Sequence, residues 1–242
     1  MQSSSSLAVA TQPAAARYNM YGFIHKALRA FMSDTLTRLG RMDVMDAEDV
    51  AASLGQTRDL LHFCRAHLEH ENRFVHPALE AREPGSTRRI AGEHVHHEDD
   101  IELLLGRVDS LERLDDDATA AGAAATRLYR DMAVFAGGNF EHMDYEEREH
   151  NATLWAHYSD AELQAIEGAL VASLPPETAM LSMRWMIPAI SHAERVQLLG
   201  GIRANAPAEV LSGVLNLARA RLDERDWSRL AAALELSPVG VA

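Results

Sequence analysis

The stretches "HLEHE", residues 67–71, and "HMDYE", residues 142–146, each place a histidine four residues before a glutamate. Residues at this spacing on an α-helix project from the same face, about one turn apart. Imidazole and carboxylate groups both suit iron and zinc. One such pair is also typical of a solvated helix surface, so the flanking residues decide between a metal site and a surface pair.

Apolar residues share the helix face of both pairs. At about 100° of rotation per residue, the face of His67 and Glu71 also carries Leu60, Cys64, Phe74 and Ala78. The face of His142 and Glu146 similarly carries Leu128, Phe135 and Gly138. Both pairs are therefore expected to point into the apolar interior. An uncompensated carboxylate is costly there, and a metal ion would compensate it.

The two segments also align with each other. "HLEHENRFVHPALEA", residues 67–81, and "HMDYEEREHNATLWA", residues 142–156, share the histidine, the glutamate and three further identical positions at an offset of 75 residues. This offset is the length of one helix pair, so the chain is expected to contain two related halves. Each half should then supply one more ligand from its first helix.

Hydrophobic periodicity predicts four long amphipathic helices. Asp43 or Asp46 can cap the second helix, and Pro84 with Gly85 separates the second from the third. Short connections between long helices predict an all-α fold, an antiparallel up-down-up-down four-helix bundle. The four predicted helices lie within residues 19–43, 60–81, 88–114 and 124–158.

The rest of the chain divides into two parts. Residues 1–16 are read as a disordered tail, which leaves residues 17–158 for the bundle. Residues 159–242 are read as a C-terminal extension of shorter helices, because Ser159 with Glu162 and Ser191 with Glu194 form capping-box patterns. The apolar cluster from Met180 to Ile187 is expected to pack onto the bundle.

The first and third predicted helices offer the remaining ligands. The first holds a single histidine, beside its apolar stripe. In the third, His94 and His97 flank the buried face, whereas His96 points away from it. The predicted metal ligands are therefore His25, His67, Glu71, His94, His142 and Glu146, with His97 as the alternative to His94. Surface or packing roles are expected for His62, His70, His76, His157 and His192.

Composition excludes several classes of function. The formal net charge of −13, without a basic stripe, argues against binding to nucleic acid or to an anionic membrane. The single cysteine, Cys64, rules out a disulfide within the chain. No apolar run reaches the roughly 18 residues that span a bilayer, and the start of the chain lacks the features of a signal peptide. A cytoplasmic location is therefore expected.

Four stretches of the sequence resemble the hemerythrin-like, HHE cation-binding proteins: "GFIHKALR", "HLEHENRFVHPALE", "GEHVHHEDDI" and "HMDYEEREHNATLW". The resemblance covers residues 17–157 and includes the proline six residues after Glu71. The Glu93-His94 pair also resembles the family motif, which favours His94 over His97. The resemblance implies two iron ions in the bundle, bridged by an oxo or hydroxo group and by two carboxylates, with zinc or manganese as alternatives.

The ligand pattern also departs from that of the oxygen-carrying hemerythrins. Those proteins use five histidines, with H-x-x-x-H on the third helix and H-x-x-x-x-D on the fourth. Here Glu98 follows His94 by four residues, and the fourth helix carries H-x-x-x-E. The set of four histidines and two glutamates is more similar to family members implicated in iron sensing and in repair of iron–sulfur centres.

These observations predict a non-haem di-iron protein that binds or senses O₂ or a related small molecule, such as NO or peroxide. Besides a helical interaction protein without a metal, two alternatives stay open. The first is iron handling or iron–sulfur repair. The second is a ferritin-like oxidase, which uses E-x-x-H on two helices; here Glu93 with His96 and Glu147 with His150 have that spacing.

Overall fold

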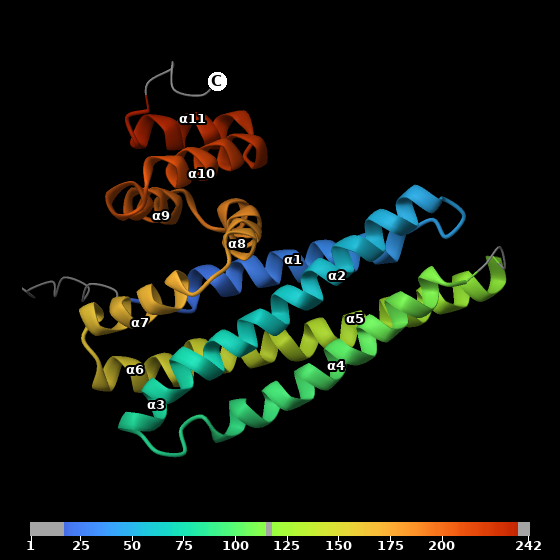
Figure 1. Ribbon diagram of the computed structural model, residues 1–242, viewed down its shortest axis with the longest axis horizontal. Helices are drawn as coiled ribbons and strands as arrows, with labels where there is room; N and C mark the ends of the chain where they lie inside the picture. The colour runs from blue at the N-terminus through green and yellow to red at the C-terminus, as the bar shows by residue number, and fades with distance from the viewer. Residues whose placement is uncertain (1–16, 115–117, 237–242) are drawn as a thin grey trace, which may run out of the picture.

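The computed structural model of the protein describes residues 17–114 and 118–236, and this part of the chain is helical and contains no strand (Figure 1). The prediction of an all-α protein is therefore confirmed. The tail predicted for residues 1–16 lies outside the described residues.

Four long helical segments lie alongside one another (Figure 1). Each segment contacts the next one along the chain, and the fourth segment also contacts the first. The segments are α1 (Gly22–Arg41); α2 (Ala47–His70) with η1 (Glu71–Val75) and α3 (His76–Arg82); α4 (Arg88–Glu112); and α5 (Ala118–Tyr145) with η2 (Glu146–His150) and α6 (Asn151–His157).

The second segment begins earlier than the apolar pattern indicates. Its cap is Asp46, whose side chain accepts hydrogen bonds from the backbone N–H groups of Glu48 and Asp49. This cap was one of the two expected from the sequence, and it satisfies first-turn donors that have no partner within the helix. Helix α2 therefore starts at Ala47, and Leu54 from its early turns is fully buried.

In each H-x-x-x-E pair the glutamate is the first residue of a π-helical turn, η1 or η2. In η1 the N–H of His76 donates to the carbonyl of Glu71, a bond that spans five residues instead of four. The extra residue shifts the helix face that follows it. As a result Val75 and Leu79 are buried, whereas Phe74 and Ala78, predicted to face inward, are only partly buried.

The C-terminal region consists of shorter helices: α7 (Asp160–Ala172), α8 (Pro176–Ala189), α9 (His192–Asn205), α10 (Ala208–Arg221) and α11 (Glu224–Ala233). Both predicted capping boxes, at Ser159 and Ser191, are present. Among the described residues, no helix combines the length and the apolar composition that crossing a membrane requires.

Helix α8 joins the C-terminal region to the long helices. It packs against α1, where the Trp185 ring stacks on Phe31 with centroids 4.0 Å apart. Trp185 and Met186 belong to the core of the long helices, as the sequence predicts. Ile187, one residue later, belongs instead to a second core formed with α9, α10 and α11. Helices α9, α10 and α11 thus share a core with α8, which anchors them to α1, whereas α7 packs against η1.

Candidate metal centre

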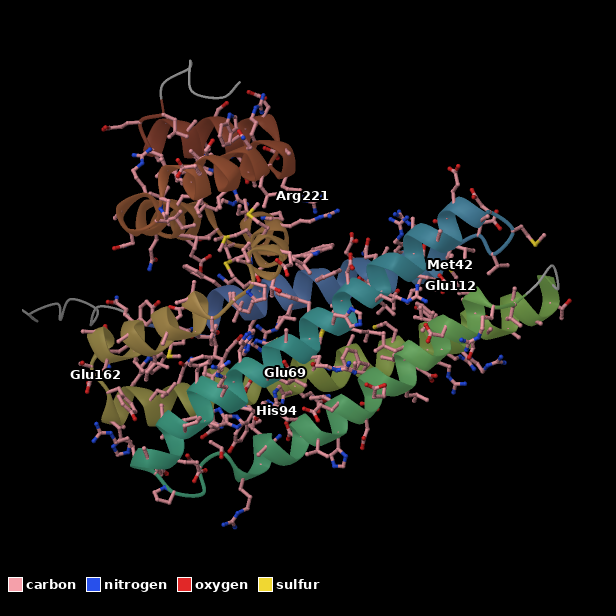
Figure 2. The ribbon with its side chains drawn as sticks, in the orientation of Figure 1. Met42, Glu69, His94, Glu112, Glu162 and Arg221 are labelled. Atoms are coloured by element: carbon pink, nitrogen blue, oxygen red, sulfur yellow. The ribbon has the colours of Figure 1, made fainter. Side chains whose placement is uncertain are left out.

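The six predicted ligands come from all four long segments and meet in the interior. Their side chains lie among the helices, as Figure 2 shows for His94 between α4 and α2. Five are buried as whole residues, and the side chain of His67 is 11% exposed. The helices that carry them are α1 (His25), α2 (His67), η1 (Glu71), α4 (His94), α5 (His142) and η2 (Glu146).

The six residues form two groups that share both glutamates. The first cluster is His25, His67, Glu71 and Glu146, and the second cluster is Glu71, His94, His142 and Glu146. Within each cluster one ligand atom per residue lies within 4.8 Å of every other. Each cluster can therefore hold a metal ion, and an ion in each would be joined by two carboxylates.

The two glutamates orient their carboxylate oxygens differently toward the clusters. Oε1 of Glu71 lies 3.2 Å from Nε2 of His67, and its Oε2 lies 3.4 Å from Nε2 of His94. This carboxylate thus directs one oxygen to each cluster. Glu146 instead places the single oxygen Oε2 between the clusters, 3.5 Å from Nε2 of His25 and 3.4 Å from Nε2 of His142.

Three of the candidate histidines are oriented by a hydrogen bond at Nδ1, the ring nitrogen that does not face the clusters. Nδ1 of His25 is 3.0 Å from a carboxylate oxygen of Glu147, and Nδ1 of His142 is 2.9 Å from one of Glu93. A carboxylate can only accept, so each Nδ1 carries the proton and each Nε2 presents a lone pair to the cluster. Nδ1 of His94 is bonded similarly, at 2.8 Å from Oδ1 of Asn72. Such outer partners are typical of metal-binding histidines.

Arginines hold the two outer carboxylates in their charged form. Arg29 donates to Glu147 at 2.6 Å, and Arg89 donates to Glu93 at 2.7 Å. Burial acts to raise the pKa of Glu147, but its hydrogen bonds from His25 and Arg29 outweigh burial and lower that pKa. The pKa of Glu93 is lowered in the same way, against burial, by bonds from Arg89 and His142.

The inner carboxylates lack hydrogen-bond partners. Both oxygens of Glu71 and both of Glu146 are buried and unpaired, as is Nε2 of His25 and of His67. Each unpaired buried polar group costs about 1–3 kcal/mol. In addition, Nε2 of His94 and Nε2 of His142 face each other at 3.2 Å. Cations in the two clusters would satisfy all of these atoms at once, so the residues present fit a pair of metal ions.

The ionisation of this interior also favours cations. Burial raises the pKa of Glu146 well above its usual value, and the nearby Glu71 carboxylate raises it further. Burial acts the same way on Glu71, but the neighbouring His67, His25 and His94 outweigh it and lower the Glu71 pKa. Glu146 therefore holds a proton more strongly than Glu71 does, and a bound cation would compete with that proton. Burial also lowers the pKa of His142 to about 3, which keeps that ligand neutral.

The alternative ligand His97 does not join either cluster. It is buried, and both of its ring nitrogens lack partners. Its ring stands edge-on to His142, with centroids 5.0 Å apart, and borders a polar pocket of about 190 Å³ that Glu93 and Asp100 also line. Of the two candidates on α4, the structure thus places His94 in the second cluster.

A third group of ligand-type residues was missed by the sequence reasoning. His76, Glu146 and His150 are all buried and have one ligand atom each within 4.8 Å of the others. His76 was expected to be a surface or packing residue, and it is buried because the π-turn of η1 rotates it inward. His150 follows Glu146 by four residues, the same spacing that identified the other pairs, so that signal was present in the sequence.

Roles for Glu93 and Glu147 were also missed. From the sequence, both glutamates have a ligand role only in the alternative of a ferritin-like site, as members of E-x-x-H pairs. The structure uses both as outer partners of histidines, and it leaves His96 exposed. Glu93 directly precedes a ligand and Glu147 directly follows one, but only the tertiary structure reveals which histidine each one contacts.

An apolar pocket of about 140 Å³ adjoins the first cluster. His67, His70 and Glu71 are among its lining residues, and its other walls come mainly from α1, α2, α7 and α8. Among the described residues, Glu167 on α7 is the one other acidic residue that lines it. Comparisons of the chain with protein-family models, with curated proteins and with solved structures return no match.

Proposed function

We propose that the protein is a hemerythrin-like, non-haem di-iron protein that binds or senses O₂ or a related small molecule, NO or peroxide. In this proposal the four long segments form an antiparallel up-down-up-down bundle around the metal centre. The observation that carries it is the meeting of two clusters that share two buried, unpaired carboxylates. The sequence resemblance over residues 17–157 supports the same reading.

The ligand types support iron as the metal. Each cluster offers two imidazoles and two shared carboxylates, a mixture that suits iron and also zinc or manganese. Four protein ligands leave open positions on an ion that prefers six. Bound iron would supply redox chemistry and open positions for a small ligand. The absence of any cysteine from both clusters argues against a soft-metal site.

The protein's own residues prepare the site in two ways. Glu147 and Glu93 fix the rings of His25 and His142 so that each Nε2 faces inward before any ion arrives. Buried apolar side chains on the bundle side, including Leu60 and Phe135, exclude bulk water. Electrostatic interactions are stronger in such a dry interior than at a surface.

The apolar pocket supports a small, weakly polar ligand. Its walls include Ile24, Phe63 and Met186, and its floor includes the ring of His67. A volume of about 140 Å³ easily admits a diatomic molecule or a peroxide. The pocket thus offers such a molecule a mainly apolar space beside His67 and Glu71 of the first cluster.

Metal analysis combined with absorption spectroscopy tests the proposal. The full chain would be loaded with Fe²⁺ without oxygen, freed of excess metal, and its spectrum recorded before and after air and again after dithionite. We expect two iron ions per chain and near-ultraviolet bands that appear in air and bleach on reduction. Titrations with O₂, peroxide and NO would then identify the ligand. Protein that retains no iron, or only one ion, contradicts the proposal.

A variant separates specific binding from adventitious iron. Glu71→Ala removes a carboxylate that directs an oxygen to each cluster, so it should lose iron. Glu69→Ala is the matched control, because Glu69 lies two residues away on the same segment and is exposed. Equal iron content in these two variants would contradict the assigned ligands.

A further inference from the structure

Two buried histidines lie beside the second cluster and belong to neither cluster, and one oxygen of Glu146 lies near them. These are His76 at the start of α3, His150 at the end of η2, and the outer oxygen of Glu146. His76 stacks on His94 with ring centroids 4.9 Å apart, and its ring lies edge-on to that of His150 at 5.7 Å. The group is therefore part of the same interior and not a surface feature.

One carboxylate oxygen of Glu146 faces the two clusters, and the other faces His150. Its Oε2 faces His25 and His142, as described above. Its Oε1 is instead 3.9 Å from Nδ1 of His150, too far for a hydrogen bond, and it has no partner. One ligand atom each from Glu146, His150 and His76 lies within 4.8 Å of the others, a separation that a single bound ion can span.

The histidines are also unsatisfied on the atoms that ligate metals. Nε2 of His76 and Nε2 of His150 are buried without a hydrogen-bond partner. The hydroxyl of the buried Tyr21 lies 3.1 Å from Nδ1 of His150. If Nδ1 donates to that hydroxyl, Nε2 of His150 holds a free lone pair. Tyr21 then has the role for His150 that Glu147 has for His25.

We propose that His76, His150 and the outer oxygen of Glu146 form a third position for a divalent transition-metal cation, next to the dinuclear centre. Two imidazoles and one carboxylate oxygen select a borderline cation such as Zn²⁺, Fe²⁺ or Mn²⁺ over Ca²⁺ or Mg²⁺. The proposal rests on the proposed function because Glu146 belongs to both sites.

The third position should be weaker than the other two. It has a single carboxylate, which it shares with both clusters. Two dications in those clusters also repel a third ion close by. We therefore expect the third equivalent to bind with a dissociation constant at least about tenfold higher than the first two.

A Zn²⁺ titration of the ion-free full chain tests the proposal without redox side reactions. Competition with a chromophoric chelator counts the equivalents and ranks their affinities. Wild type is compared with His76→Leu/His150→Leu, which removes both imidazoles of the third position. The matched control is His62→Leu/His96→Leu, because both of these histidines are exposed. Crystals soaked in Zn²⁺, with anomalous diffraction, locate each ion.

Three equivalents in wild type and in the control, with two in the His76/His150 variant, would establish the third position. Two equivalents in all three proteins would overturn it and leave the dinuclear centre standing. One equivalent that only the His76/His150 variant loses would keep this position and overturn the dinuclear proposal. No bound Zn²⁺, or one equivalent that every protein retains, would overturn both.

Loss of folding in the double variant must be separated from loss of a ligand. Thermal unfolding of the ion-free proteins reports stability, and His150→Gln serves as a milder change that keeps a polar side chain. It should also lose the third equivalent while it retains the first two. If His150→Gln folds normally and still binds three ions, His150 is not a ligand and the proposal fails.

Discussion

The two pairs of long helical segments carry the same pattern of candidate ligands but surround it differently. His25 and His94 occupy matching places in the two clusters, and the residues just before them are Ile24 and Glu93. Glu93 accepts a hydrogen bond from His142 in its own half. Ile24 cannot do this for His67, and it lines the apolar pocket instead. The change from Glu93 to Ile24 thus separates His142, which has a hydrogen-bond partner, from His67, which lines the pocket.

A second difference follows from the 75-residue offset between the halves. Asn72 and Glu147 are equivalent positions, each directly after a glutamate that belongs to both clusters. Each holds the histidine from the other half, so Asn72 contacts His94 and Glu147 contacts His25. The partner of His25 is charged and that of His94 is neutral. A charged partner makes an imidazole a stronger electron donor to any bound metal, so the two clusters are not equivalent.

The largest effect should come from Glu146, which belongs to both clusters and to the third group. Glu146→Ala is expected to abolish iron binding, because it removes an oxygen that faces both clusters. Circular dichroism should show little loss of helix, since the variant also removes an unpaired buried carboxyl group. Iron analysis after loading is the measurement. Two retained iron ions would refute the shared role of this residue.

Replacing Glu93 by isoleucine, the residue at the equivalent position in the first half, should weaken binding of one of the two proposed ions selectively. Glu93→Ile gives His142 the environment of His67 and removes its outer partner. Loss of such a partner typically lowers metal affinity about 10–100-fold. We expect this loss for one of the two ions in a chelator-competition titration. Glu98→Ile is the control, because Glu98 is exposed on the same helix. An equal effect of both changes would mean that the hydrogen bond is unimportant.

Replacing the charged partner by the neutral one tests the second difference. Glu147→Asn copies Asn72 and should weaken the ion held by His25 by about tenfold, the lower end of the range for outer partners. The same competition titration measures the change. The reciprocal change, Asn72→Glu, should tighten the ion held by His94. If neither change alters affinity, the charge of the outer partner does not distinguish the halves.

The smallest effect concerns stability beside the apolar pocket. Burial raises the pKa of Glu167 from 4.5 to about 7. Between these values the folded chain retains a proton that the unfolded chain releases, so stability falls as pH rises from 4.5 through 7. The shift corresponds to at most about 3 kcal/mol. Because the side chain is partly exposed, we expect about 1 kcal/mol.

Glu167→Gln should therefore stabilise the ion-free protein by about 1 kcal/mol at pH 8 and have little effect at pH 4. Urea unfolding at both pH values measures this. A pH-independent difference between variant and wild type would show that the carboxyl group is solvated in the folded protein. Glu177→Gln, an exposed change on α8, controls for loss of surface charge.

Much of the fold follows from local sequence signals. The Asp46 cap and the capping boxes at Ser159 and Ser191 occur where the sequence places them. In each H-x-x-x-E pair, the spacing of four residues keeps the histidine and the glutamate on one helix face, and both members of each pair lie in a cluster. These features depend on residues close together in the chain, so one sequence suffices to predict them.

The parts that were missed depend on longer-range structure. No local preference marks the π-turns, yet η1 is the reason that His76 is buried and Phe74 is not. The outer hydrogen bonds join residues far apart in the chain, such as His25 and Glu147. The apolar pocket exists because α7 and α8 fold back over α1 and α2, which no periodicity in one helix can indicate.

Anomalous diffraction at the iron edge tests the central claim most directly. Crystals of the full chain loaded with two equivalents of Fe²⁺ would be measured on both sides of the edge. The account predicts two anomalous peaks, one between His25 and His67 and the other between His94 and His142, with Glu71 and Glu146 between them. A single peak, peaks elsewhere or no peak in well-ordered crystals would contradict it.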